Sequence, residues 1–186
     1  MKAMRQLRDE HEGIKLMLDV LKEVVTLGET ERKLDLDHIE RMLEFFKVFV
    51  DKCHHGKEED LLFPELVKHG ILNEGGPIGV MLSEHGQGRK YIQGMADSLP
   101  GLRRGTPEAA KLFKENANGY ISLLTQHISK ENDVLFMTGD KVLSTQENET
   151  LLEAFEKLEV ERIGVGKHEE FHKLLHKLQE IYLKQS

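Results

Sequence analysis

Apolar residues recur at steps of three and four along most of the chain, and this spacing indicates helices with one buried face. The stripe in residues 4–27 carries a histidine among its apolar members, which are Leu7, His11, Ile14, Leu18, Leu21 and Val25. The stripe in residues 37–69 contains His54 and Glu58, and the stripe in residues 77–98 contains His85. Histidine therefore stands where a helix normally buries apolar side chains.

Segments rich in Gly, Pro and polar residues divide this pattern into six expected helices, which cover residues 4–27, 37–69, 77–98, about 106–137, about 144–160 and 167–184. Thr106 and Pro107 predict an N-cap followed by proline at the first helical position. Ser144 and Glu147 predict a capping box. Pro64 removes a backbone donor, so a kink or an early end of the second helix is expected there.

The chain also contains an internal repeat. The segment "HHGKEEDLLF" (54–63) is matched by "HISKENDVLF" (127–136), and "RDEHEGIKLMLDVL" (8–21) resembles "LSEHGQGRKYIQGM" (82–95). Each half is therefore expected to be a helix pair, with one histidine on its first helix and His-x-x-x-Glu on its second.

The repeat and the short connections predict an all-α fold. Residues 1–140 are expected to form an up-down-up-down four-helix bundle, and residues 141–186 two additional C-terminal helices that pack on it. The repeated histidines then lie at similar heights on the seams that face the bundle axis.

Histidine and glutamate four residues apart lie one above the other on a helix face. A single histidine on an apolar stripe is usually a packing residue, and a single His-x-x-x-Glu is usually a surface pair. Two buried carboxylates without partners would be costly, whereas a bound cation removes that cost. We therefore predict a metal site built from six groups: His11, His54, Glu58, His85, His127 and Glu131.

The ligand types indicate which metal is expected. Four imidazoles and two carboxylates without a thiolate argue against a closed structural zinc site. Mixed N/O donors from a two-fold repeat suit two iron ions, or manganese, bridged by Glu58 and Glu131. An oxo or hydroxo bridge from solvent would complete the pair, and zinc is a possible substitute.

His55 and Glu59 offer a second frame of the same His-x-x-x-Glu pattern. Alignment of the two repeats pairs His54 with His127 and leaves His55 opposite Ile128. The frame that starts at His54 is therefore favoured, with His55 in an outer position or as an occasional extra ligand.

The order His, His-x-x-x-Glu, His, His-x-x-x-Glu resembles the hemerythrin-like, HHE cation-binding domain family over residues 1 to about 140. The resemblance implies a non-heme di-iron centre in a four-helix bundle, with the six residues above as ligands. Members of the family carry dioxygen, sense oxygen, iron, nitric oxide or peroxide, or take part in the repair of iron centres.

The chain departs from oxygen carriers in one respect. They have a second histidine one turn from the first on the third helix, where this chain has Met81 and Arg89, and a carboxylate where it has Asn132. The site is thus one ligand short of the usual set. His168 lies on the apolar stripe of the last helix, after the flexible segment 164–166, so we predict it as a seventh ligand or as a gate.

Composition narrows the function further. A formal net charge of −7 gives no basic field for nucleic acid or an anionic membrane. No signal peptide or long apolar run is evident, and a single cysteine, Cys53, suits the reducing cytoplasm. The favoured function is a di-iron protein that binds or senses O₂, NO or peroxide, and binding is favoured over catalysis. A peroxidase or oxidase, a metal store and an interaction module remain alternatives, and the pattern names no protein partner.

Overall fold

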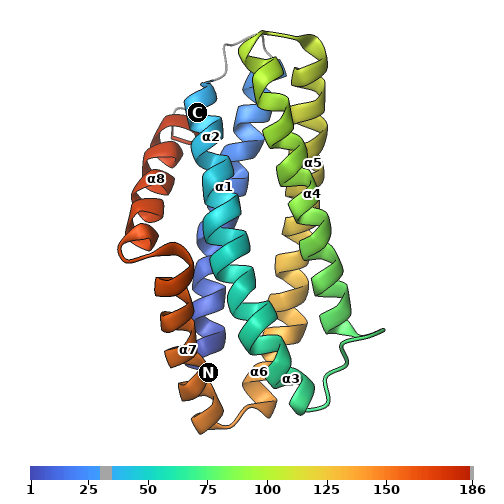
Figure 1. Cartoon of the computed structure of the whole chain (residues 1–186), viewed down its shortest axis with the longest axis vertical. Coiled ribbons are helices and arrows are strands. Elements are labelled where there is room, and N and C mark those ends of the chain that lie inside the picture. The colour runs from blue at the N-terminus through green and yellow to red at the C-terminus, as the bar shows by residue number, and fades with distance from the viewer. Residues whose placement is uncertain (30–34, 185–186) are drawn as a thin grey trace.

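A computed structural model describes residues 1–29 and 35–184, and these residues are helical with short turns and no strand among them. The all-helical fold predicted from the periodicity is therefore confirmed. The long elements lie side by side as rods (Figure 1). The α-helices of the described residues are α1 (Lys2–Glu29), α2 (Leu36–Phe45), α3 (Phe63–Lys68), α4 (Pro77–Arg103), α5 (Pro107–Lys130), α6 (Phe136–Val142), α7 (Thr145–Ile163) and α8 (Lys167–Tyr182).

Four helical rods form the bundle: α1, the run from α2 to α3, α4, and the run from α5 to α6. Three segments of π-helix interrupt the second and the fourth rod. They are η1 (Phe46–His55) and η2 (Glu58–Leu62), between α2 and α3, and η3 (Glu131–Leu135), between α5 and α6. Pro64 follows η2 in the first turn of α3, where a missing backbone donor is tolerated, so the helix continues to Lys68. The π-helical turns coincide with the predicted metal residues, as such turns often do at functional sites.

Two expected helix ends are wrong. The third rod was expected to end near residue 98, but α4 continues to Arg103 with Pro100 inside it. The fourth was expected to end near 137, but η3 and α6 carry it to Val142. Both extensions bury small residues, Gly101 and Gly139, against neighbouring helices, and this packing outweighs the local breaker signals.

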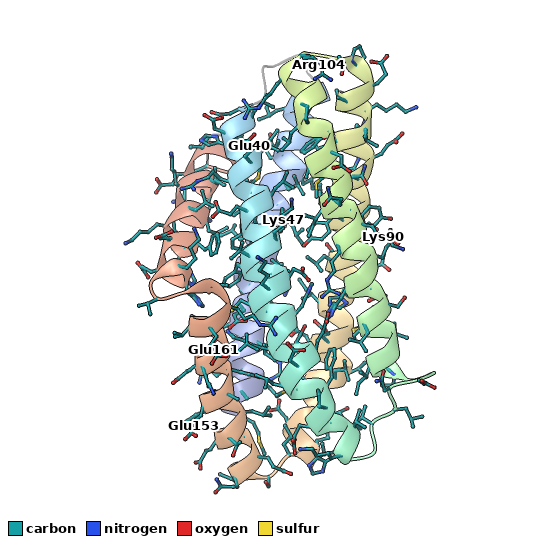
Figure 2. All side chains as sticks on the ribbon, in the orientation of Figure 1. Glu40, Lys47, Lys90, Arg104, Glu153 and Glu161 are labelled. Atoms are coloured by element: carbon teal, nitrogen blue, oxygen red, sulfur yellow. The ribbon has the colours of Figure 1, made fainter. Side chains whose placement is uncertain are left out.

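The apolar core consists of two clusters with a polar layer between them. On α1, for example, Met4 and Leu7 belong to one cluster, Ile14 and Met17 belong to the other, and His11 lies between. The same order holds on the other three rods. Charged side chains such as Lys90 and Glu153 point away from the bundle (Figure 2). The polar layer is therefore enclosed by apolar side chains above and below it.

The C-terminal helices lie along one flank of the molecule (Figure 1). Helix α7 packs against η1 and α1, and α8 packs against α1. The predicted capping box is present, with both bonds between Ser144 and Glu147. Gly164 and Gly166 adopt φ values of 86° and 80°, which favour glycine, and they turn the chain between the two helices. The division of the chain near residue 140 stays a prediction.

None of the helices in the described part of the chain is both long enough and apolar enough to cross a membrane.

Candidate metal centre

All six predicted metal residues lie in the polar layer, and none has more than 1% of its surface exposed. Four rods supply them: α1, the rod from α2 to α3, α4, and the rod from α5 to α6. His55, for which the sequence suggested an outer or occasional role, is also turned inward and is 4% exposed. Seven buried imidazole and carboxylate side chains thus occupy one level of the bundle.

The seven residues form two groups that share Glu58. His11, His54 and Glu131 join Glu58 in one group, and the ligand atoms of the group lie within 4.8 Å of one another. The second group meets the same criterion and consists of His55, Glu58, His85 and His127. Two adjacent four-residue groups around a shared carboxylate are the arrangement expected of a site for two metal ions.

Nε2 of His85 and Nε2 of His127 lie 3.0 Å apart, but other inner atoms of these residues have no hydrogen-bond partners within the described chain. They include both carboxylate oxygens of Glu58 and of Glu131, and Nε2 of His11 and of His54. Buried polar groups are nearly always paired, so such a concentration of unpaired acceptors is unusual. A cation would satisfy all of them at once. The donor set, with imidazole nitrogen and carboxylate oxygen, therefore fits a bound metal.

The two buried carboxyl groups influence each other. Burial raises the pKa of Glu58 well above its ordinary value, and the nearby charge of Glu131 raises it further. Burial would raise the pKa of Glu131 too, but His127 and His11 outweigh it and hold that pKa well below its ordinary value. Without a cation, one carboxyl group is therefore protonated and the other ionised.

Each of the four predicted histidine ligands has its Nδ1 within hydrogen-bond distance of an oxygen outside the layer. His11 meets Asn132 at 3.0 Å and His85 meets Glu59 at 2.7 Å. The two halves of the repeat make equivalent contacts. Nδ1 of His54 lies 2.8 Å from Glu10 in the first half, and Nδ1 of His127 lies 3.0 Å from Glu84 in the second. Donation from Nδ1 leaves Nε2 unprotonated and facing the centre, which is the form that binds metal.

These outer partners were not predicted from the sequence. A signal was nevertheless present, because Glu10-His11 and Glu84-His85 occupy equivalent places in the two repeats. The pairing could not be read from it, because each of these glutamates contacts the histidine of the other helix in its pair and not its neighbour in sequence.

A buried lysine stabilises one of these outer carboxylates. Lys57 is 0% exposed, and its Nζ lies 2.7 Å from Glu10 and 2.8 Å from Glu159 of α7. Burial would raise the pKa of Glu10, but the hydrogen bond and charge of His54, together with Lys57, lower it to about 2. An ion-paired connection therefore runs from the C-terminal helices through Lys57 and Glu10 to His54.

His168, predicted as a seventh ligand or a gate, belongs to neither group. Its Nδ1 lies 2.8 Å from Glu159, its Nε2 lies 2.8 Å from Nε2 of His172, and its side chain is 30% exposed. Glu159, Lys57 and Glu10 connect it to His54. Its role as a ligand stays a prediction.

Cys53 is fully buried, and burial raises its pKa to about 12. A thiol with this pKa stays protonated at neutral pH and is a poor nucleophile or metal ligand. Cys53 therefore serves as a small apolar residue of the core.

Comparison with known proteins supports a metal site. Iron-sulfur cluster repair proteins YtfE from Escherichia coli O1:K1 / APEC and from Escherichia fergusonii are 38% identical to this chain over 87 residues. The aligned part is 45% of this chain and only 39% of each relative, so the match spans well under half of those proteins. No solved structure matches the chain.

A family description matches a much larger part of the chain. Residues 2–138 match the hemerythrin HHE cation-binding domain, which confirms the resemblance seen in the order of histidines and glutamates. The matched range includes both four-residue groups and ends before α7. The chain therefore belongs to the hemerythrin HHE cation-binding domain family.

Proposed function

We propose that this chain is a di-iron protein of the cytoplasm that binds or senses O₂, NO or peroxide. The observation that carries the proposal is the pair of four-residue groups that share Glu58 and present unpaired buried ligand atoms. His11, His54 and Glu131 would hold one ion, His55, His85 and His127 the other, and Glu58 would bridge them. Glu131 also lies near His127 and His85, at 3.2 and 3.8 Å, so it supports a second bridge.

Bound iron would supply a redox-active cation with an exchangeable position for a small ligand. The chain's own residues prepare the site for it. The outer oxygens fix the histidine rings with Nε2 inward, and the apolar clusters on either side limit access of bulk water. We also propose that the four rods run in up-down-up-down order, which brings the two halves of the repeat face to face.

A second candidate is a role in the repair of iron centres, or turnover of peroxide or oxygen at the same site. The similarity to iron-sulfur cluster repair proteins favours the first of these, over the 87 residues that align. Peroxide consumption with a reducing co-substrate would indicate an enzyme. A reversible spectral change with O₂ or NO, without turnover, would indicate a binding or sensing protein.

Metal analysis with an optical spectrum of the freshly purified protein tests the proposal. We expect about two iron atoms per chain, the number that two groups of ligands predict, and bands that shift when azide or NO is added. A colourless protein that contains one zinc ion and does not respond to either probe would contradict it.

Acid should release the metal and weaken the fold together. Ligation needs neutral histidine and ionised glutamate, so affinity should fall roughly tenfold per pH unit for each competing proton. Burial lowers the pKa of His54 to about 4, so its contribution to stability is lost as pH falls from about 6.5 towards that value. Glu131 and Glu10, whose pKa values are also lowered, lose their contributions below about 4.5.

Glu58 acts in the opposite direction, because its raised pKa favours the folded state at low pH. His85, whose pKa is raised, acts in the same direction as Glu58. The groups whose pKa values are lowered are more numerous, since His55 and Glu59 join His54, Glu10 and Glu131, so a net loss of stability is expected. A titration from about pH 7 to 4, which brackets the free histidine and glutamate values, with metal content and circular dichroism measured together, checks this. Full retention of metal at the acid end would rule out the proposed ligands.

His168 is tested separately. If it is a ligand or a gate, His168→Ala should shift the optical spectrum and change azide or NO affinity by about tenfold or more, as loss of a ligand or its support does. His176→Ala, on the same helix, is the matched control. A wild-type spectrum with unchanged affinity would remove His168 from the site.

A further inference from the structure

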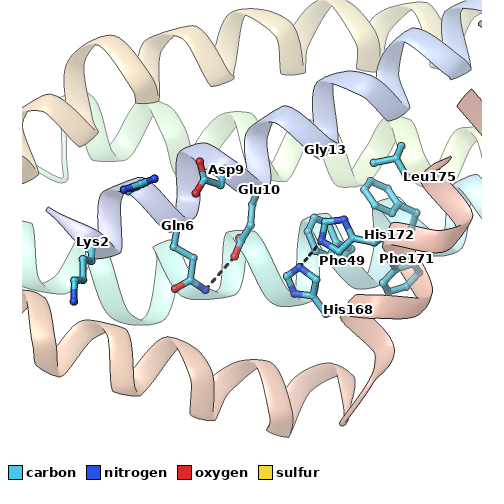
Figure 3. Close-up of a pocket in the computed structure, with 12 residues that line it drawn as sticks. Lys2, Gln6, Asp9, Glu10, Gly13, Phe49, His168, Phe171, His172 and Leu175 are labelled. Carbon is cyan, nitrogen blue, oxygen red and sulfur yellow. Dashed lines mark hydrogen bonds between the residues drawn. The ribbon is translucent and has the colours of Figure 1, made fainter.

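A cavity of about 300 Å³ lies beside the metal centre and outside it. Its walls come from one face of α1, from Phe45 and Phe49 of the neighbouring rod, and from α8 (Figure 3). Small-molecule sites in proteins begin at about this volume and combine apolar walls with a few polar groups. A molecule of one or two rings would fill it.

Aromatic rings form one end of the cavity. Phe45 and Phe49 stack with centroids 4.9 Å apart, and Phe171 of α8 stands edge-on to both, at 5.6 and 6.0 Å. The imidazole of His168 meets Phe49 edge-on at 5.2 Å. Aromatic pairs prefer such offset and edge-on arrangements, so this end of the cavity favours a planar aromatic guest.

The carboxylate of Glu10 supplies a buried acceptor to the lining, with the residue only 6% exposed. Its Oε1 accepts from Lys57 and from Gln6, whereas its Oε2 accepts from His54. A carboxylate oxygen has two lone pairs, so Oε2 can accept one further donor. In Figure 3, Glu10 extends from α1 toward the same space as His168.

The charges around Glu10 restrict the guest further. Lys2, Arg5 and Asp9 also line the cavity, but the group that reaches Glu10 meets a different environment. An anionic group there would be repelled by the carboxylate, and a cationic group would be placed beside the buried ammonium of Lys57, which is 2.7 Å from Glu10. Both would also lose hydration on entry. A neutral hydroxyl group avoids these costs and can donate to Glu10.

Gly13 indicates that the space is kept open. It lies in the cavity lining and in the middle of α1, where glycine destabilises a helix relative to alanine. A Cβ at this position would meet only Leu175 Cδ2, at an ordinary contact distance of 3.6 Å. The packing of the fold therefore does not require glycine here, and a larger side chain would fill the cavity.

We propose that this cavity is a binding site for a small neutral phenol, with its ring against Phe49 and Phe171 and its hydroxyl group donating to Glu10. The proposal goes beyond the function proposed above, because it assigns an organic ligand to the chain. Glu10 also accepts from His54, so an occupied cavity is one hydrogen bond from a predicted metal ligand.

The test is calorimetric titration of the metal-loaded full chain with phenol. Anisole, which has the same ring but no donor, and benzoate, which carries a negative charge, are the comparison probes. We expect phenol to bind with at least about tenfold higher affinity than either, since a site that hydrogen-bonds a hydroxyl group rejects analogues that lack it. Equal affinity for anisole, tighter binding of benzoate, or no binding of phenol at millimolar concentration would each overturn the proposal.

The variant Gly13→Leu tests whether phenol binds in this cavity. We expect it to weaken phenol binding by at least about tenfold, because the new side chain occupies the space of the ring. Gly86→Leu is the matched control, since a Cβ at Gly86 meets nothing within 4 Å, and it should bind phenol as the wild type does. Gly13→Ala serves if Gly13→Leu fails to fold, and should weaken binding by a smaller factor.

Unchanged affinity in a folded Gly13→Leu variant, or an equal loss in Gly86→Leu, would show that phenol binds elsewhere. Because binding is measured directly, this result does not depend on which metal the centre holds or on whether it binds O₂, NO or peroxide.

Discussion

Glu58→Gln is expected to lose both metal ions. Glu58 belongs to both four-residue groups, and its two oxygens lie 3.5 Å from Nε2 of His54 and of His85. Loss of an outer hydrogen bond to a ligand commonly costs about 10–100-fold in metal affinity, so loss of a shared charged ligand should cost more than about 100-fold. Metal per chain after dialysis, measured by mass spectrometry, checks the expectation.

The same substitution should leave the metal-free fold intact or make it more stable at neutral pH. The raised pKa of Glu58 means that the folded, metal-free chain keeps this group protonated, whereas the unfolded chain ionises it. That difference costs stability above the ordinary glutamate pKa, and glutamine removes it. Thermal unfolding with a chelator present measures the effect.

Glu153→Gln, the same change on an exposed position of α7, is the control and should alter neither metal content nor unfolding. If Glu58→Gln keeps two metal ions per chain, the shared-carboxylate arrangement is wrong. If it loses metal only because the metal-free chain unfolds, the electrostatic account of the two carboxyl groups is wrong.

Lys57→Met is expected to destabilise the fold by about 3–5 kcal/mol, because removing one partner of a buried ion pair leaves an uncompensated buried charge. Lys57 is 0% exposed and separates two carboxylates, Glu10 at 2.7 Å and Glu159 at 2.8 Å. Methionine keeps the apolar length of the side chain, so the loss reports mainly on the charge. Urea unfolding of the metal-free chain measures it.

Two further variants separate the charge from the packing. Lys52→Met changes an exposed lysine of η1, less than two turns before Lys57, and should shift stability by less than about 0.5 kcal/mol, as surface substitutions usually do. Adding Glu10→Gln to Lys57→Met removes the uncompensated charge and should restore part of the loss. If Glu10→Gln destabilises the Lys57→Met variant by as much as it destabilises the wild type, the two residues are not coupled.

The sequence alone determined the helical fold, the family and the residues that meet in the polar layer. Steps of three and four fix which side chains share a helix face, and this periodicity is a local property of the chain. The repeat then placed His11, His54, His85 and His127 at matching heights, and the structure brings them together with Glu58 and Glu131. Their role as metal ligands stays a prediction.

The helix ends were predicted less well. Pro100 and the segment around Gly139 are local signals for a break, yet both lie inside continuous helices. Burial of neighbouring residues against other helices decides whether such a signal ends a helix, and that burial is not visible in a short stretch of sequence.

The tertiary structure alone decided which side chains complete the centre. A regular helix turns about 100° per residue, so His54 and His55 should not both face inward, but the wider turn of η1 brings both into the layer. The partners of the histidines depend on which helices are neighbours, so the contact of Glu10 with His54 could not be read from either residue alone. The cavity beside Gly13 likewise exists only because α8 packs on α1, since its walls come from segments more than 100 residues apart in the chain.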